Sequence, residues 1–515
     1  AIDKYDVLQG GFIWDWVDQS LEYTNDDGVK YWAYGKDFHP DLPSDGNFLN
    51  NGLMNPNREP HPHAFEVKKV YQAIRFSVND LEAGKFAIEN RFDFIDINKY
   101  QLTWAIEADG EAYANGIMAL PSIKPTETAI VDIDLPILPS NDNKEYFITL
   151  NAVLTQPESL LEAGHAIAYE QFELANNRKN KNLMAKNSAL RSEQAFTQQS
   201  SSSNIIFKSD KAEIVFDQKS GWLTQYTINN TALLSTPLTA NFWRPPTDND
   251  LGNGMQKWAK VWQDAAKNLS LTALDVKPID SGYMVQSHYK SAAFKGSYVV
   301  SYQINSQGQI HVNSQLTIAD GQKLPNIPRL GMQLTMPGNF QRFSWFGRGP
   351  HETYADRKTS GEISLYSYLV KDQIHHYARP QENANRTDVR WLALKNAEDT
   401  GLIIIGDKPL SASAWPYKQS DIDFLDGKDG SASASGLVPV TTKHGAEVPI
   451  RDLVTVNIDY KQMGVGGDTS WGRLVHAQYT IPAKSYQYGF TLSPVDHLTT
   501  MLSDVARTIT INNKH

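Results

Sequence analysis

Apolar and polar residues alternate along the chain for nearly 300 residues beyond position 204, and this pattern limits the folds that the sequence can adopt. One stretch places Ile310, Val312 and Leu316 on the same face. A period of two is that of a β-strand with one buried face. So many strands require two broad antiparallel sheets packed together, and the lack of a fixed repeat disfavours a propeller or a solenoid. The sequence therefore predicts a large antiparallel β-sandwich over residues 204–497.

A smaller region of alternation precedes it, over residues 75–175. Leu102, Trp104 and Ile106 share one face of a segment, and clusters of turn residues separate comparable segments. About 100 residues with short alternating strands are typical of an immunoglobulin-like β-sandwich. Residues 176–203 are polar and end in a run of serines, which indicates a linker between the two β domains.

Residues 1–74 have a different pattern. Residues 8–17, LQGGFIWDWV, are predicted to form a short buried strand. A loop rich in Asp, Gly and Asn follows, and Ala64 and Val67 then begin a helical spacing behind Pro62. A strand, a long loop and a helix together form one βα unit.

The composition excludes several classes of function. Lys and Arg number 48 against 58 Asp and Glu, so the net charge is −10, and no basic block is present to neutralise nucleic-acid phosphates. The absence of cysteine excludes disulfides and thiol catalysis but leaves the compartment open, cytoplasmic or periplasmic. The apolar runs are far shorter than the roughly 20 residues of a membrane-spanning helix. We therefore expect a soluble protein that has neither a nucleic acid nor a membrane as its partner.

Two tryptophans and two aspartates follow the apolar run closely. In a strand, Trp14, Trp16 and Asp18 share one face while Asp15 takes the other. Packing and a local turn would explain these residues. Alternatively, Trp14 forms the flat apolar wall of a sugar site, because a pyranose ring offers C–H groups on one face and hydroxyls around its rim.

Four histidines were considered as metal ligands. His61 and His63, and the pair His375 and His376, lack metal-site spacing with further ligands. We interpret them as solvated or helix-entry residues.

Six segments, taken together, resemble the C-terminal part of the multi-domain β-galactosidases of glycoside hydrolase family 2. They stay in order from Gly10 to about Asp496, and they are GGFIWDWVDQSL, NFLNNGLMNPNREPHPHAFEVKKVYQ, RPPTDNDLG, FGRGPHETYADR, RPQENANRTDVRW and MGVGGDTSWG. The resemblance implies a mainly β protein that hydrolyses terminal non-reducing β-D-galactosyl residues with retention. It assigns residues 1–74 to the last strand and helix of a (β/α)8 barrel, 75–175 to an immunoglobulin-like β-sandwich and 176–203 to a linker. Residues 204–497 would form a galactose mutarotase-like β-supersandwich, and residues 498–515 a C-terminal tail.

The resemblance also assigns roles to four residues of this sequence. Trp14 would line the galactose subsite at the C-terminal end of its barrel strand. The carbonyl of Phe48 and the side chain of Asn51 would bind a monovalent cation, Na+ or K+, and Asn51 would also reach the galactose 6-hydroxyl. Trp471 would be the platform for the leaving group, carried into the barrel mouth by a glycine-rich loop. We interpret the glycines of that loop as residues that allow a backbone conformation closed to others.

The catalytic residues of such an enzyme are expected outside this sequence. A retaining glycosidase needs two carboxylic residues about 5 Å apart. In the family both are glutamates in motifs that do not occur here, and the Mg2+ ligands accompany them, so no catalytic residue is predicted in this chain. Glu352 and Asp356 could mimic such a pair, but their segment resembles a structural loop of the supersandwich.

Two functions therefore remain as hypotheses. In the first, the chain acts on a β-galactoside substrate only together with an N-terminal complement of the same enzyme, commonly within a homo-oligomer, and is inactive alone. In the second, it is a non-catalytic carbohydrate-binding multi-domain β protein that uses Trp14 and Trp471.

Overall fold

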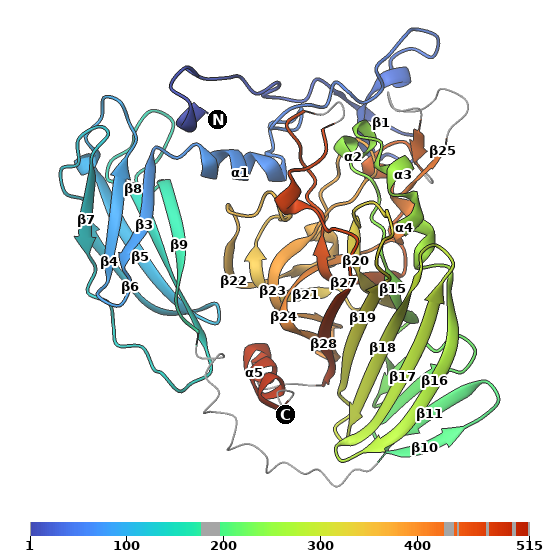
Figure 1. Ribbon diagram of the computed structural model, residues 1–515. Helices are drawn as coiled ribbons and strands as arrows, with labels where there is room; N and C mark the ends of the chain where they lie inside the picture. The colour runs from blue at the N-terminus through green and yellow to red at the C-terminus, as the bar shows by residue number, and fades with distance from the viewer. Residues whose placement is uncertain are drawn as a thin grey trace.

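The structure is a computed structural model that describes residues 2–176, 196–426, 437–439, 442–469, 473–496 and 501–512. Figure 1 shows three regions: an N-terminal segment along the top, a small β-sandwich on the left and a large β domain on the right. The fold is mainly β, as the sequence predicts. No helix among these residues is long and apolar enough to cross a membrane.

The N-terminal segment has little regular structure. It contains the short helix η1 (Ile2–Lys4), the hairpin β1 (Leu21–Thr24) and β2 (Lys30–Ala33), the turn η2 (Gly35–Asp37) and helix α1 (Pro62–Val70). The predicted helix is confirmed, and proline stands at its first position, where the missing N–H costs nothing.

The predicted buried strand over residues 8–17 is not formed. Val17 makes one isolated parallel bridge to Met54, and the backbone hydrogen bonds of Asp15 and Trp16 go to residues 51–54 of the following loop. The side chain of Phe12 is fully exposed. A strand needs at least one neighbouring strand with which to form a ladder of hydrogen bonds, and among the described residues only that irregular loop lies beside this stretch.

The small β-sandwich has seven strands in two antiparallel sheets. Its core contains Phe86, Leu102 and Ile148, each fully buried, so the alternating pattern of the sequence predicts the inward face correctly. The arrangement confirms the immunoglobulin-like prediction. One sheet has the order β3-β4-β7 (Ile74–Asp80, Lys85–Asn90, Thr128–Asp132), and the other has the order β6-β5-β8-β9 (Glu111–Ala119, Tyr100–Ala108, Glu145–Leu154, Ala166–Asn176) with η3 (Ile97–Lys99) before β5.

The large β domain forms one hydrogen-bonded system of 17 strands instead of two separate sheets. Strand β24 explains the difference, because it pairs with β23, β27 and β28 and so joins what would otherwise be two sheets. The first half consists of β10 (Thr197–Ser200), β11 (Asn204–Lys208), β12 (Ala212–Asp217), β13 (Leu223–Ile228), β14 (Thr231–Ala232), β15 (Thr236–Asn241), β16 (Leu269–Ile279), β17 (Gly282–Ser291) and β18 (Gly296–Asn305). The second half consists of β19 (Ile310–Ile318), β20 (Arg329–Pro337), β21 (Arg342–Gly349), β22 (Glu362–Leu369), β23 (Arg386–Lys395), β24 (Gly401–Trp415), β27 (Leu453–Gln462) and β28 (Tyr486–Val495).

The curled sheet encloses a continuous hydrophobic core. Ile310, Val312 and Leu316, which the sequence places on one face, are all buried in it. Three short helices follow β15: α2 (Asp248–Gly252), α3 (Met255–Trp258) and α4 (Lys260–Ala265). The remaining elements are η6 (Val370–Gln373), η7 (Gln419–Asp421), β25 (Phe424–Asp426), β26 (Leu437–Pro439), η8 (Gly445–Glu447) and η9 (Ala477–Tyr479).

Two predicted connecting regions contain regular structure. Strand β10 falls within the predicted linker and pairs with β11. Helix α5 (Leu502–Asn512) falls within the predicted tail and packs between the small sandwich and the large domain (Figure 1). Ala506 and Ile509 of α5 are buried in a cluster with Phe147 of the sandwich and Trp391 of the large domain. The polar composition of the linker gave no sign of β10, whereas Leu502, Val505, Ala506 and Ile509 follow the helical spacing of α5.

Candidate functional site

An open cavity of about 570 Å³ lies where the N-terminal segment meets the large β domain. Its walls come from five stretches of the sequence. The N-terminal segment provides Trp14, Phe48 and Asn51, and the loop after β27 provides Val465 and Gly466. The rest of the wall comes from the α2 region and from the segments 354–357 and 377–382 of the large domain.

Trp14 lines this cavity with an indole that is 77% exposed. Asp15, beside it, accepts hydrogen bonds from its neighbour's amide, that of Trp16, and from Gln19 Nε2. The bond from Gln19 lowers the pKa of Asp15. Asp15 therefore fixes the local turn, and Trp14 is left free to offer a flat apolar surface to a ligand.

Asp18 holds the base of the same wall. Its carboxylate is buried, accepts a hydrogen bond from the Gly52 amide at 2.7 Å and is hydrogen bonded to His61 Nε2 at 2.7 Å. His61 Nδ1 lies 2.8 Å from His375 Nε2 of the large domain. The aspartate thus ties the end of the aromatic stretch to the loop and to the large domain.

The solvated half of our interpretation holds for His376, which is exposed, but not for His61, which is buried, or for His63 and His375, which are largely covered. His61 is 4% exposed and stands at the N-cap of α1, so the helix-entry half is correct. Burial lowers the pKa of His63 and that of His375 to about 3. His376 is hydrogen bonded to the carbonyl of Gly445. No group of three or more potential metal ligands of the His, Cys, Asp or Glu type occurs in the described part of the chain.

The two predicted cation ligands lie together on the cavity wall. Asn51 Nδ2 donates a hydrogen bond to the Phe48 carbonyl oxygen at 2.5 Å. Rotation of the amide would present two oxygens at one point, which suits a hard monovalent cation. The donor set therefore fits the predicted group.

Trp471 lies outside the described residues, but its loop is described up to residue 469 and again from 473. The loop enters the cavity through Val465 and Gly466. None of the three loop glycines, Gly464, Gly466 and Gly467, has the left-handed φ that we expected to explain them. Instead, a Cβ on Gly464 would lie 2.5 Å from the carboxylate of Asp356. Close approach of a charged side chain, not backbone freedom, requires glycine here.

Glu352 and Asp356 are not arranged as a catalytic pair. The carboxylate of Glu352 is buried and accepts hydrogen bonds from Arg357, from the Tyr377 hydroxyl and from the Ala384 amide. Burial acts to raise the pKa of Glu352, but the Arg357 guanidinium and these hydrogen bonds hold it at about 2. A permanently ionised, fully bonded carboxylate is a structural one.

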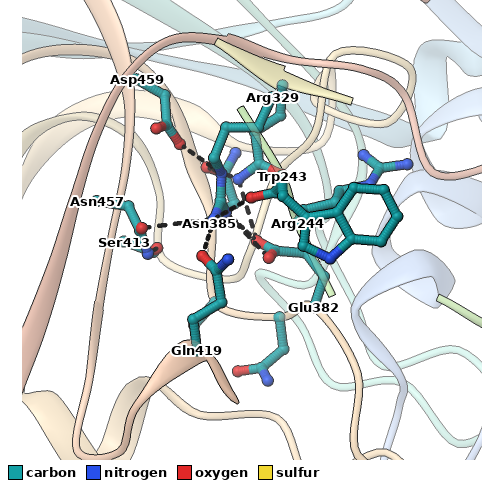
Figure 2. A network of polar contacts seen from close by, with 12 residues as sticks. Trp243, Arg244, Arg329, Glu382, Asn385, Ser413, Gln419, Asn457 and Asp459 are labelled. Carbon is teal, nitrogen blue, oxygen red and sulfur yellow. Dashed lines mark hydrogen bonds and ion pairs between the residues drawn. The ribbon is translucent and has the colours of Figure 1, made fainter. Parts of the chain in front are cut away.

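A buried ionic network supports the cavity floor and was missed in the sequence. Figure 2 shows Arg329 between Glu382, which it contacts at 3.0 Å, and Asp459 at 3.1 Å. All three side chains are fully buried, and Glu382 reaches the cavity. Burial raises the pKa of Asp459 to about 7 and also raises that of Glu382. Glu382 stands in the quoted segment RPQENANRTDVRW, but no local pattern indicated its partners.

Asp248 is a second residue that sequence reasoning missed. It accepts hydrogen bonds from Asn47 Nδ2 at 2.7 Å, Arg379 Nε at 2.9 Å and Gln381 Nε2 at 2.8 Å. Since Asn47 belongs to the N-terminal segment, this carboxylate bridges the two regions at the rim of the cavity. An aromatic wall with convergent amides and carboxylates can bind a ligand that has one apolar face and many hydroxyls.

Comparisons with known families agree with the order of the three regions. The chain matches the family described as beta galactosidase small chain over residues 208–492. It matches beta-galactosidase domain 4 over residues 86–175, and the TIM barrel domain of glycosyl hydrolases family 2 over residues 1–76. These matches confirm the resemblance that the six sequence segments indicate.

Curated relatives match almost the whole chain. It is 34% identical to a beta-galactosidase of Priestia megaterium over 495 residues, which cover 96% of this chain and 45% of the relative. The identity is 31% to a beta-galactosidase of Vibrio cholerae, with 96% and 45% covered, and 29% to that of Pseudoalteromonas haloplanktis, with 96% and 46% covered. The chain thus spans about 45% of the length of these relatives. Among solved structures, a galactose 1-epimerase of Lactobacillus acidophilus matches 59% of this chain and 99% of its own, with 6% identity and a TM-score of 0.29.

Proposed function

Because this chain belongs to the β-galactosidases of glycoside hydrolase family 2, we propose that it takes part in the hydrolysis of terminal non-reducing β-D-galactosyl residues of β-galactosides. The observation that carries the proposal is the shared cavity. Trp14 and Asn51 line it from the N-terminal segment, and the loop that leads to Trp471 enters it from the large domain. One open site thus collects residues separated by more than 400 positions.

The residues take separate roles in the proposal. Trp14 stacks on the apolar face of galactose, and Asn51 hydrogen bonds its 6-hydroxyl. Trp471 forms the platform on which the leaving group stacks. The Phe48 carbonyl and the Asn51 side chain hold Na+ or K+, which would orient sugar hydroxyls by coordinating their oxygens.

The two catalytic glutamates of the retaining mechanism, and the Mg2+ ligands, are supplied by an N-terminal complement of the same enzyme. Support comes from the N-terminal segment, where Val7 is 87%, Phe12 105% and Trp16 64% exposed. Exposed apolar side chains grouped in one stretch mark a contact surface. We propose that the complement covers this stretch and that the complete enzyme is a homo-oligomer.

Complementation tests the proposal. A nitrophenyl β-galactoside is assayed with this chain, with the upstream half of a family relative, and with both. Turnover is expected only in the mixture, and Trp14→Ala should lower kcat/KM there by about 10- to 100-fold, the range expected when a buried aromatic contact is lost. Phe94→Ala, at a 95% exposed position of the small sandwich, is the matched control and should leave kcat/KM unchanged.

Other outcomes would contradict the proposal. Turnover by the isolated chain would show that its own carboxylates suffice. Galactose binding by the chain in calorimetry, with no turnover in any mixture, would favour the non-catalytic carbohydrate-binding alternative.

A further inference from the structure

The glycine-rich loop is held by two charged side chains of the large domain, one on each side of its backbone. Asp356 accepts hydrogen bonds from its amides, and Arg244 donates to its carbonyls. Both contacts fall on residues 463–466, where the loop leaves β27 and reaches the cavity. We call these four residues the loop base.

The Asp356 contact uses both carboxylate oxygens. Oδ1 accepts from the Val465 amide at 3.1 Å, and Oδ2 accepts from the Gly466 amide at 2.7 Å. Successive amides that converge on one anion form a strong, oriented site. A Cβ at position 464 would lie 2.5 Å from this carboxylate, and one at position 466 would lie 3.1 Å from it. The glycines therefore allow the carboxylate to approach.

The Arg244 contact is rigid because it is buried. The guanidinium is fully buried and forms a bidentate pair with Asp250 at 2.9 and 3.1 Å. Its remaining donors bind the carbonyls of Met463 and Gly464, the latter at 2.8 Å. Arg244 anchors one edge of the loop base, and Asp356, half-buried on the cavity wall, sets the direction of the other.

We propose that Asp356 is a positioning residue that aims the loop base into the cavity and so determines affinity for the leaving group. The inference rests on the proposed function for the loop's role in binding the leaving group, but the contact itself does not. Without the carboxylate, the loop base loses two hydrogen bonds at its cavity edge while the wall around Trp14 stays intact. Affinity for a large leaving group should fall, and affinity for galactose should not.

Hydrogen exchange on this chain tests the contact directly. In Asp356→Asn, the amides of Val465 and Gly466 should exchange about 10- to 100-fold faster, as expected for loss of a charged hydrogen bond. Cleavage by trypsin after the exposed Arg473 should accelerate alongside. The matched control is Asp468→Asn, which removes the same charge from an exposed position of the loop, where it pairs with exposed His476, and should leave both rates unchanged.

A second variant separates the loss of the contact from a general loss of folding. Gly464→Ala keeps the charge of Asp356 but places a methyl group where the carboxylate lies, so exchange at residues 465 and 466 should rise as in Asp356→Asn. Unchanged exchange in both folded variants would overturn the proposal, whatever their activity.

Kinetics in the complemented enzyme tests the consequence. Asp356→Asn should raise KM for a galactosyl disaccharide by about 10-fold while the inhibition constant of free galactose changes less than about 2-fold, because the lost contact is one charged hydrogen-bond pair. Equal effects on the disaccharide and on galactose would overturn the assignment to the leaving group. Faster exchange without turnover in any mixture would instead contradict the proposed function and still support the contact between Asp356 and the loop base.

Discussion

The large β domain and the N-terminal segment use the same side chain in opposite ways. Trp262 and Trp415 are fully buried in the large domain, where they fill the space between strands. Trp14 and Trp16 of the N-terminal segment are 77% and 64% exposed. The comparison teaches that indoles stabilise one region by burial, whereas in the other they are available to a ligand or a partner.

The two regions also differ in what holds them in place. Polar contacts join the N-terminal segment to the large domain: Tyr34 donates to the Lys443 carbonyl at 2.6 Å, and Glu66 accepts from the Ser360 amide at 2.9 Å. His61 and His375 add a contact at 2.8 Å. We call these contacts, together with that of Asn47 to Asp248 and that of Asp37 to His444, the polar seam. As pH falls, a region held by such a seam should lose stability at a higher pH than a hydrophobic core does.

The largest effect is expected in the core of the large domain. Trp262→Ala removes a fully buried indole and its hydrogen bond to the Pro325 carbonyl at 2.9 Å. The free energy of unfolding of the large domain should fall by about 3–5 kcal/mol, the range for truncation of a buried aromatic. Urea unfolding followed by tryptophan fluorescence measures the change.

Trp14→Ala is the matched control for this prediction. It removes an indole from the exposed wall, so the unfolding midpoint of the isolated chain should shift by less than the equivalent of about 0.5 kcal/mol. A destabilisation as large as that of Trp262→Ala would break the comparison between the two regions.

A smaller effect is expected when acid protonates His375 of the polar seam and His63, whose ring stacks on that of His61. The pKa of His63 and that of His375 lie at about 3 in the folded chain, against about 6.5 when unfolded. Burial thus favours the neutral rings, so their contribution is complete above pH 6.5 and is lost as pH falls toward 3. At pH 5 the loss is about 2 kcal/mol for each ring.

Hydrogen exchange at several pH values measures this opening. Between pH 7 and 5, amides of residues 48–63 should lose protection while strand β19 keeps its own. His375→Gln should reduce the pH dependence, and the exposed His39→Gln should leave it unaltered. Simultaneous loss of protection in β19 would show that seam and core open as one unit.

The smallest effect is expected on the exposed hairpin of the N-terminal segment. Lys30 and Glu22 form an ion pair at 2.7 Å between side chains that are 70% and 45% exposed. Lys30→Ala should change the thermal midpoint by less than the equivalent of about 0.5 kcal/mol, because solvent and salt screen such pairs. A larger shift in differential scanning calorimetry would mean that the hairpin is more than a surface feature.

Much of the fold could be predicted from the sequence, because strand patterns are local. The inward face of β19 and the helix α1 follow from spacing alone. The strand predicted over residues 8–17 failed because pairing depends on neighbours, not on its own residues. Helix α5 carries a helical spacing at Leu502, Val505 and Ile509, but the core that these residues contact could not be inferred from the sequence.

Part of the lining of the candidate site could be predicted from residue type, while the roles of these residues stay predictions. Trp14, Phe48 and Asn51 all line the cavity. The role of Asp356 could not be read from its segment, because its partners lie 109 and 110 positions away on the glycine loop. Likewise Arg329 sits 53 positions from Glu382, and only the curled sheet brings them together.

Helix α5 has a mechanical consequence for the whole chain. Arg507 pairs with Asp109 of the small sandwich, 398 positions earlier, after the chain has passed through the large domain. The string of domains is thereby closed into a ring. A twist of the small sandwich about the large domain would have to break these contacts of α5 together with direct ones such as the Arg390–Glu145 ion pair at 2.8 Å, so the helix shares the load with the interface itself.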